Sequence, residues 1–153
     1  MMSSVAIYLW FTGGKAEEAA SLYVSVVRNS GIDEILRRED GSAFIIRFHL
    51  DGQNFLALNG EPGHEFTDAI SISVSVDDQD QLDTMWNELA SGGEEGNCGW
   101  LKDRFGVSWQ IIPSIVAELM ASPNLEGSAS AWNALLGMGK LDIATLQNAY
   151  DNA

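Results

Sequence analysis

The chain has 153 residues, of which 46% are hydrophobic, and a net charge of −14 from 22 acidic and 8 basic residues. This length is enough for one domain with its own core, and the hydrophobic content argues against a disordered chain. The excess of acid argues against nucleic acid and anionic membrane surfaces as partners, because both repel a negatively charged protein. A neutral or cationic small molecule is compatible with this charge.

The sequence also limits the compartment. No apolar run reaches the ~20 residues that a membrane-spanning helix needs. Residues 1–12 lack the basic region and the cleavage site of a secretory signal peptide. Cys98 is the single cysteine, which excludes an internal disulfide and suits a reducing environment. These features predict a cytoplasmic protein.

The first half of the chain predicts one strand, one helix and three further strands. Apolar residues alternate with others from Val5 to Phe11, which is the period of a half-buried strand. Gly13-Gly14 ends this run, and apolar residues with helical spacing follow. Asp40-Gly41 and Asp51-Gly52 separate the later strands, as such pairs do in hairpins. The expected elements are a strand over 5–11, a helix over 15–28, and strands over 32–37, 43–50 and 54–59.

The second half repeats the beginning of this order. Ile70, Ile72, Val74 and Val76 alternate with serines, and Gly92-Gly93 ends the helix that follows. The repeat is about 63 residues, judged from Tyr8 and Ser71. The expected elements are a strand over 70–76, a helix to about residue 90, and strands near 94–98, 99–103 and 107–112.

Residues after Pro113 predict three helices. They cover 115–121, 129–136 and 142–150, with Ser114, Ser128 and Asp142 as N-caps. We expect these helices to pack on the outside of a sheet or on a partner subunit. The whole chain, 1–153, then forms a single domain with one module at about 5–60, a second at about 68–113 and a helical extension at 114–153.

The order of elements and several short motifs resemble one known family. The sequence is similar to the PhnB-like group, also labelled 3-demethylubiquinone 3-methyltransferase-like, of the vicinal-oxygen-chelate or glyoxalase and bleomycin-resistance superfamily. The matching motifs are Leu9-Trp10-Phe11, Ala16-Glu17-Glu18-Ala19-Ala20, Tyr23, Ala57-Leu58-Asn59-Gly60, Phe66-Thr67, Ala69-Ile70-Ser71, the whole of Cys98 to Pro113, Leu136-Gly137-Met138 and Lys140-Leu141-Asp142.

This resemblance implies an α+β fold in which two βαβββ modules form a cupped mixed sheet, and it implies a homodimer. Most of the superfamily's chemistry uses a divalent metal. The expected ligand positions fall here on Tyr8, Ser71 and Gln110, and on Ala57 or Asn59. None of these is His, Asp or Glu, the ligands that divalent metals prefer. We therefore expect neither a metal nor another cofactor.

The same positions suggest a polar and aromatic lining. If the alternation holds, Tyr8, Trp10, Ser71, Ser73, Ser75, Ser108 and Gln110 share the concave face, with Asn59 nearby. Such a surface suits a neutral organic ligand. Alternatively, the aromatic residues belong to the core or to a dimer interface, and the serines only face solvent. The candidate ligand-binding residues are Tyr8, Trp10, Asn59, Ser71, Ser73, Trp100 and Gln110.

Other reactive residues have ordinary interpretations. His49 and His64 match no metal-ligand spacing and are expected to be surface or hydrogen-bonded histidines rather than a metal pair. Cys98 has no histidine near it in sequence, which favours a structural cysteine over a nucleophile. Asp103 and Arg104 are expected to hold the turn before Val107 rather than to act in catalysis.

Three classes of function therefore stay open. The first is a metal-free protein that binds a small molecule, where the negative charge favours cationic compounds. The second is an enzyme that uses Tyr8, Gln110 or Cys98 without a metal. The third is a metal-dependent lyase, isomerase or dioxygenase with displaced ligands. Methyltransferase activity has no support, because Gly13-Gly14 and Gly92-Gly93 mark element boundaries and form no Gly-rich cofactor turn.

Overall fold

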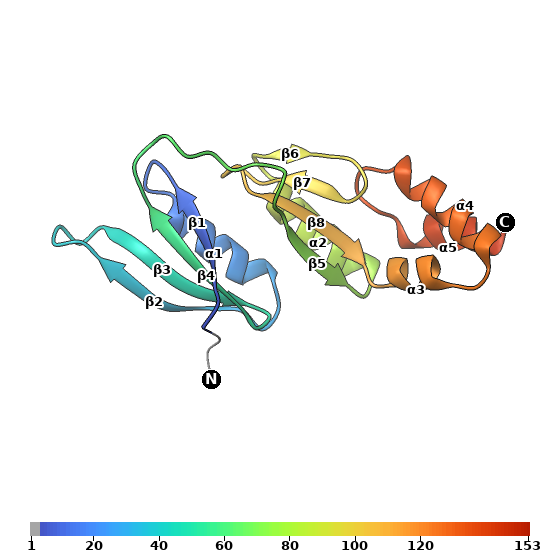
Figure 1. Cartoon of the computed structure of the whole chain (residues 1–153), viewed down its shortest axis with the longest axis horizontal. Helices are drawn as coiled ribbons and strands as arrows, with labels where there is room; N and C mark the ends of the chain where they lie inside the picture. Colours follow the sequence, from blue (N-terminus) through green and yellow to red (C-terminus); the bar gives the residue numbers. More distant parts are fainter. Residues whose placement is uncertain (1–3) are drawn as a thin grey trace. The chain divides into compact units, whose positions relative to one another are not determined.

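The computed structural model describes residues 4–153 and divides into two compact units, Met1–Phe66 and Thr67–Ala153, here unit 1 and unit 2 (Figure 1). Residues 1–3 of the segment searched for a signal peptide lie outside the described residues. Unit 1 contains β1 (Ile7–Phe11), α1 (Ala16–Val26), β2 (Gly31–Arg37), β3 (Ala43–Leu50) and β4 (Gln53–Asn59). Unit 2 contains β5 (Ile72–Val76), α2 (Gln79–Ala90), β6 (Glu94–Glu95), β7 (Trp100–Lys102), β8 (Ser108–Pro113), α3 (Ile115–Ala121), α4 (Leu125–Leu136) and α5 (Ile143–Asp151).

Unit 1 is a four-stranded mixed sheet with one helix on one face. The strand order is β1-β4-β3-β2, in which β1 runs parallel to β4 and the other pairs are antiparallel. The helix packs on β3 and β4 and buries a small-residue stripe that ends in an aromatic ring, Ala16, Ala19, Ala20 and Tyr23. The sheet residues buried on that side include Ile46, Phe48, Phe55 and Ala57. One face of the sheet is therefore core, and the other is available to carry function.

Unit 2 begins with the same arrangement. Its sheet has the order β5-β8-β7-β6, again with one parallel pair, β5 with β8, and α2 packs against β8, β7 and β5. The first strand is shorter than the alternation predicted. Ile70 is 57% exposed and lies in a turn, where its N–H donates to the carbonyl of Thr67. Apolar alternation alone did not reveal this turn, which is held by a hydrogen bond from the Ala69 N–H to Oγ1 of Thr67 at 3.2 Å.

The C-terminal helices differ from the prediction in one start and two caps. Helix α4 begins at Leu125 rather than at residue 129, and Asn124 caps it by accepting from the Gly127 N–H at 3.1 Å. Ser128, predicted as a cap, instead lies inside the helix and donates to the Leu119 carbonyl at 2.6 Å. Ser114 precedes α3, but its side chain makes no capping hydrogen bond. Asp142 caps α5 as predicted, through the Thr145 N–H at 2.7 Å.

Two main-chain hydrogen bonds join the C-terminal helices to the loop before β7. The N–H of Cys98 donates to the Met138 carbonyl at 2.7 Å, and the N–H of Gly99 donates to the Gly139 carbonyl at 2.9 Å. At this contact Cys98 adopts a left-handed backbone conformation with φ of +60°. The extension is therefore part of unit 2.

The predicted α+β class is confirmed: both units combine a four-stranded mixed sheet with a helix packed on one face. Among residues 4–153, none of the helices has the length and apolar character needed to cross a membrane.

Candidate functional site

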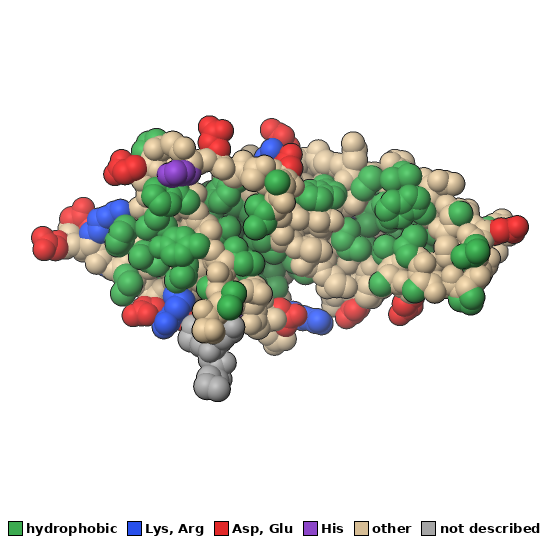
Figure 2. Space-filling model, viewed as in Figure 1, with side chains coloured by type: hydrophobic (Ala, Val, Ile, Leu, Met, Phe, Trp, Pro, Cys, Tyr) green, Lys and Arg blue, Asp and Glu red, His purple; other side chains and the backbone are tan. Residues whose placement is uncertain are grey.

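The open face of the unit 1 sheet carries a row of four side chains, one from each strand. The strand register places Tyr8 beside Leu56, Leu56 beside Arg47, and Arg47 beside Glu34. Tyr8 is 50% exposed, and Arg47 Nη2 pairs with Glu34 Oε2 at 3.0 Å. Figure 2 shows hydrophobic side chains gathered over this sheet. The row joins an aromatic ring, an aliphatic side chain and a neutralised cation, a combination that suits an organic ligand.

Trp10 lies two residues further along β1 on the same face, where the segment after β4 holds it in place. Its indole N–H donates to the Glu61 carbonyl at 2.9 Å, and its ring meets that of His64 edge-on, with centroids 4.6 Å apart. A Cβ added at Gly60 would lie 2.3 Å from the indole, so only glycine fits beside it. The half-buried Trp10 ring is thus held in one orientation by its contacts with Gly60, Glu61 and His64.

The open face of the unit 2 sheet carries three of the predicted site residues in one row. Ser73 pairs with Gln110 across β5 and β8, and Gln110 pairs with Trp100 across β8 and β7. Gln110 Nε2 donates to Oγ of Ser71 at 2.9 Å, which fixes the direction of the carboxamide. The side-chain oxygen of Gln110 accepts no hydrogen bond from the residues that the structure describes. An oriented acceptor therefore stands beside an exposed serine and an indole.

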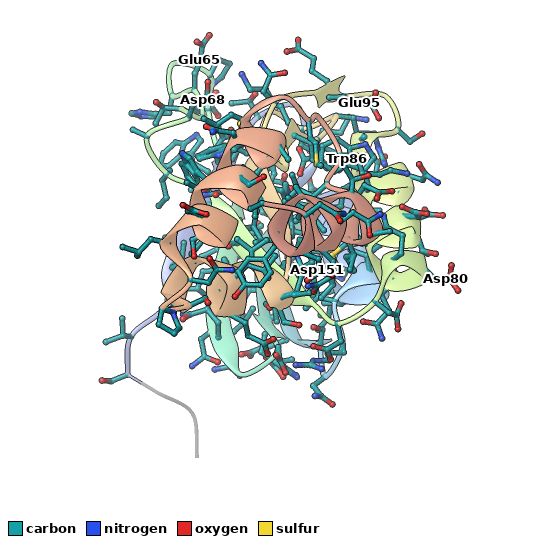
Figure 3. All side chains as sticks on the ribbon, turned by 90° about the vertical axis from the view of Figure 1, so that its right-hand side faces the viewer. Glu65, Asp68, Asp80, Trp86, Glu95 and Asp151 are labelled. Carbon is teal, nitrogen blue, oxygen red and sulfur yellow. The ribbon has the colours of Figure 1, made fainter. Side chains whose placement is uncertain are left out.

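The next row of the same face carries charge. Lys102 pairs with Ser108 in the register, and both contact Asp68, which lies ahead of β5. Ser108 Oγ donates to Asp68 Oδ1 at 2.7 Å, and Lys102 Nζ lies 3.5 Å from the same oxygen. The hydrogen bond from Ser108, aided by the Lys102 charge, holds the pKa of the Asp68 carboxyl below its ordinary value. Figure 3 labels Asp68 at the periphery of the molecule. The row next to Gln110 therefore carries a cation, Lys102, whose charge is neutralised by Asp68.

The two rows occupy equivalent places in the two sheets. Aligning β1 with β5 by their bounds matches Tyr8 to Ser73, and the register then matches Leu56 to Gln110 and Arg47 to Trp100. Counting back from the helix that follows each strand instead matches Tyr8 to Ser71, the partner that the sequence repeat predicted, because each lies eight residues before the first residue of that helix, Ala16 or Gln79. The duplicated sheets present an aromatic and ionic row in unit 1 and an amide, hydroxyl and indole row in unit 2.

Asn59 is held by the fold instead of facing a ligand. Its Oδ1 accepts from the Ala16 N–H at 2.8 Å, and its Nδ2 donates to the Ala43 carbonyl at 2.9 Å. Both bonds are buried, and the first satisfies a free N–H at the start of α1. Asn59 therefore ties β4 to α1 and to β3, and we leave it out of the proposed ligand-binding residues.

The residues at the family's metal positions do not fit a divalent metal. Tyr8, Ser71 and Gln110 offer only neutral oxygens, and Ala57 has none. Within residues 4–153, no group of three or more His, Cys, Asp or Glu side chains could hold a metal ion. His49 pairs instead with Asp33, Nδ1 to Oδ1 at 3.0 Å, in agreement with the expected hydrogen-bonded histidine.

Two other candidates from the sequence have structural contacts. Asp103 is 2% exposed and accepts from the N–H groups of Phe105 and Val107, which confirms its predicted role in the turn. The Cys98 thiol is half-buried, and its sulfur lies 3.9 Å from the Leu136 carbonyl. Figure 3 labels a further structural pair, Trp86 and Glu95, in which the indole N–H donates to the carboxylate at 2.5 Å.

Sequence reasoning missed three residues of these faces, Arg47, Leu56 and Asp68. Arg47 alternates with the buried Ile46 and Phe48 in β3, so its period alone could have placed it on the open face. The contact between Asp68 and Ser108 spans 40 positions, and nothing local in the sequence indicates it.

Comparison with solved structures gives the following relatives. The PhnB protein from Bacillus cereus is 31% identical, with coverage of 73% of this chain and 100% of that chain and a TM-score of 0.67. Protein PA1353 from Pseudomonas aeruginosa is 22% identical, with coverage of 72% and 98% and a TM-score of 0.59. The fosfomycin resistance protein FosX from Listeria monocytogenes, solved in a complex with Mn(II) and sulfate, is 16% identical, with coverage of 72% and 92% and a TM-score of 0.51. The last two show the fold alone.

No curated protein matches the chain. The model of one protein family matches residues 3–112, which reach from the beginning of unit 1 into β8. That match covers strands β1 to β7 and all but the last residue of β8, and it ends before the helices that follow β8. The chain therefore belongs to the family described as 3-demethylubiquinone-9 3-methyltransferase, the PhnB-like group of the glyoxalase and bleomycin-resistance fold.

Proposed function

We propose that this protein binds a small organic molecule, neutral or cationic, on the open faces of its sheets and does so without a resident metal. The observation that carries the proposal is the row formed by Ser73, Gln110 and Trp100. In that row the free carboxamide oxygen of Gln110 is held in a fixed direction, beside a hydroxyl and an indole. A few oriented polar groups beside aromatic surface are typical of sites that bind organic ligands.

The charge of the chain and of these rows selects the ligand class. The net charge of −14 disfavours an anion at long range. In unit 1, Glu34 neutralises Arg47, and in unit 2, Asp68 neutralises Lys102. An anionic ligand would therefore have to displace a carboxylate from either cation. A neutral or cationic ligand can instead use the oxygen of Gln110 and the hydroxyl of Ser73 without breaking an ion pair.

The alternative is a metal-dependent lyase, isomerase or dioxygenase, and the donor atoms at the family's metal positions do not support it. A methyltransferase reaction is likewise outside the proposal, because neither sheet is the parallel α/β sheet with a Gly-rich turn on which cofactor-binding methyltransferases are usually built. The homodimer and the cytoplasmic location expected from the sequence belong to the proposal as well.

Fluorescence titration of the full chain with three probes tests the proposal. The probes are N-phenyl-1-naphthylamine, which is neutral, rhodamine 6G, which is cationic, and 8-anilinonaphthalene-1-sulfonate, which is anionic. We expect the neutral or the cationic probe to bind more tightly than the anionic one. Gln110→Leu should weaken that binding about tenfold, since one lost hydrogen bond costs about 1 kcal/mol and the other partner is left unpaired.

The matched control is Gln147→Leu. Gln147 lies on α5, where its Nε2 donates to Oδ1 of Asp151 on the same helix at 2.9 Å. Equal probe binding by the wild type and by Gln110→Leu would overturn the proposed site, whereas loss of binding in both variants would show an effect of unfolding. Preference for the anionic probe would overturn the ligand class.

Metal content tests the metal-free part separately. The protein is incubated with Zn, Ni, Mn or Fe(II), dialysed exhaustively and analysed for bound metal. We expect no stoichiometric metal, and one tightly held ion per chain would favour lyase or oxygenase chemistry instead.

A further inference from the structure

His49 and Asp33 form a hydrogen-bonded pair on the unit 1 sheet. The ring Nδ1 lies 3.0 Å from Oδ1 and 3.1 Å from Oδ2 of Asp33. Because a carboxylate only accepts hydrogen bonds, Nδ1 carries the proton, and the neutral ring has its lone pair on Nε2. Nε2 makes no hydrogen bond with the residues that the structure describes. The pair therefore presents an acceptor, in a fixed tautomer, that the fold itself does not use.

A β-bulge in β2 supplies the carboxylate of this pair. Ile32 pairs with Phe48 on β3, and Glu34 pairs with the preceding residue of β3, Arg47. Asp33 is thus an extra residue between two consecutive pairs of the register. The bulge lets both acidic side chains reach the open face, where each contacts a different basic side chain of β3. Bulges are common beside functional sites because they re-aim a side chain in this way.

The imidazole lies against the open face of the sheet. His49 follows Arg47 by two residues in a strand without a bulge of its own, so both side chains point to the same face. Gly31 is the residue opposite His49 on β2, and a Cβ added there would lie 3.3 Å from Cε1 of the ring. Glycine therefore leaves the room that the ring occupies, and Asp33 fixes its direction.

Apolar surface adjoins the imidazole on the same face. His49 pairs with Asn54 on β4, and Leu56 lies two residues further along that strand. Such diagonal neighbours are about 7–8 Å apart, within reach of one aromatic group. Leu56 pairs in turn with Tyr8, whose side chain is half exposed. A ligand can therefore rest an apolar group on Leu56 and Tyr8 while its polar end reaches Nε2.

The charge near the imidazole decides which hydrogen-bond donor fits. Asp33 and Glu34 each carry −1 and Arg47 carries +1, so these three groups sum to −1 beside a neutral ring. A carboxylic acid ligand would be an anion, which this cluster and the net charge of −14 disfavour. A metal ion needs further ligands, and no group of three or more His, Cys, Asp or Glu in the described part of the chain could hold one. A protonated amine supplies both the donor and the positive charge.

We propose that the pair of His49 and Asp33 binds the ammonium group of an organic amine whose apolar part lies on Leu56 and Tyr8. One N–H of the ammonium donates to Nε2, and the hydrogen bond from Nδ1–H to Asp33 polarises the ring and strengthens that contact. The inference rests on the proposed function, because it names the class of ligand for the open face of unit 1. It does not involve the Gln110 row.

Isothermal titration calorimetry of the full chain at pH 8 tests the proposal, since an ordinary imidazole is neutral there and an alkylamine is protonated. The probes are 2-naphthylmethylamine, which has the charge and the donor, (2-naphthylmethyl)trimethylammonium, which has the charge without the donor, and 2-naphthalenemethanol, which has the donor without the charge. We expect the amine to bind about tenfold more tightly than either of the others, as one hydrogen bond to a charged group predicts.

Two variants test the residues, with circular dichroism as a check that each is folded. His49→Phe keeps an aromatic ring but removes the acceptor, so the amine should lose its advantage over the trimethylammonium compound. Asp33→Asn can donate to Nδ1 and thereby move the proton to Nε2. It should weaken amine binding and shift the nitrogen NMR signals of the ring toward the other tautomer. Gln147→Leu, on α5, should bind all three probes like the wild type.

Several results would overturn the site. They are a wild type that does not bind the amine, one that binds the amine and the trimethylammonium compound equally, and a folded His49→Phe that keeps the preference. An alcohol that binds as tightly as the amine would overturn the ligand class, and loss of binding in Gln147→Leu as well would overturn the assignment to His49. The proposed function is tested separately, by the three fluorescent probes and Gln110→Leu, so the two can fail independently.

Discussion

The indole N–H of Trp109 donates to Oδ2 of Asp103 at 2.9 Å, and both side chains are almost completely buried. The other carboxylate oxygen accepts from the N–H groups of Phe105 and Val107, at 2.9 and 3.0 Å. One side chain thus closes the turn between β7 and β8 and sets the rotamer of the largest residue of β8. Gln110, the next residue along the chain, faces the other side of the sheet. The carboxylate thereby holds the strand that presents the proposed ligand-binding amide.

Replacing this carboxylate should destabilise unit 2. Asp103→Asn keeps the shape but replaces one acceptor oxygen with a donor, so at least one buried N–H loses its partner. We expect the free energy of unfolding to fall by about 2–3 kcal/mol. Urea unfolding followed by tryptophan fluorescence measures it. Asp80→Asn, at an exposed position of α2, should change stability by less than about 0.5 kcal/mol. Equal stability of the two variants would contradict this role of Asp103.

Asn59→Ala should lower stability without changing ligand affinity. The variant loses the bond to the Ala16 N–H at the start of α1 and the bond to the Ala43 carbonyl, which together are expected to cost about 2 kcal/mol. Its affinity for the preferred probe, measured where the variant is folded, should stay within about twofold of the wild type because Asn59 is buried away from the open face. Asn87→Ala, an exposed position on α2, is the control for stability. A large loss of affinity with unchanged stability would return Asn59 to the binding site.

Gln79→Leu should loosen the attachment of α5 to α2. Gln79 Oε1 accepts from the Ile143 N–H at 2.8 Å, and Nε2 donates to the Leu141 carbonyl at 3.1 Å. Leucine satisfies neither group, so we expect a loss of about 2 kcal/mol and faster hydrogen exchange in α5 than in α2. Gln81→Leu removes one exposed contact, with the Asp77 N–H, and should leave exchange in α5 unchanged. If both variants exchange alike, the link through Gln79 contributes little.

The N-cap of α5, Asp142, should make the stability of the fold depend on pH, with stability lost as the pH falls. The hydrogen bond from the Thr145 N–H lowers the pKa of Asp142 below its ordinary value of 3.8. A carboxyl whose pKa is lowered in the folded state stabilises the fold above pH 3.8, and this contribution is lost as the pH falls through the folded-state pKa. Asp142→Asn keeps a capping oxygen but not the charge. Its melting temperature should be below that of the wild type at pH 6, and the difference should shrink toward pH 3. A constant difference would exclude the carboxylate charge as the cause.

Local sequence patterns predicted where the strands begin and end better than they predicted which side chains contact one another. β3 covers residues 43–50 as predicted, because its apolar alternation is continuous and Asp-Gly pairs stand on both sides. The start of α4 was missed because Gly127 and Ser128 resemble a loop. The fold accepts Gly127 inside the helix since the Tyr150 ring leaves no room for a side chain there. That contact joins positions 23 residues apart, and no local pattern contains it.

For the candidate site too, the sequence predicted the local features and missed the contacts between distant residues. Alternation placed Tyr8, Ser73 and Gln110 on one kind of face, because the period of a strand is local. It could not show that Asn59 caps α1 from 43 residues away, or that Glu61 and His64 hold the Trp10 ring. These assignments depend on which side chains meet after folding, and here they separate a structural amide from one that is free to bind.

The hydrogen bonds of Cys98 and Gly99 to the Met138 and Gly139 carbonyls have a consequence for how this protein can vary. Every amino acid has a main-chain carbonyl, so a substitution at Met138 leaves the acceptor in place. The extension is thus seated by atoms that mutation does not remove, while its outward side chains can change. Related chains can acquire new contact surfaces on α4 without rebuilding the two sheets to which the extension is attached.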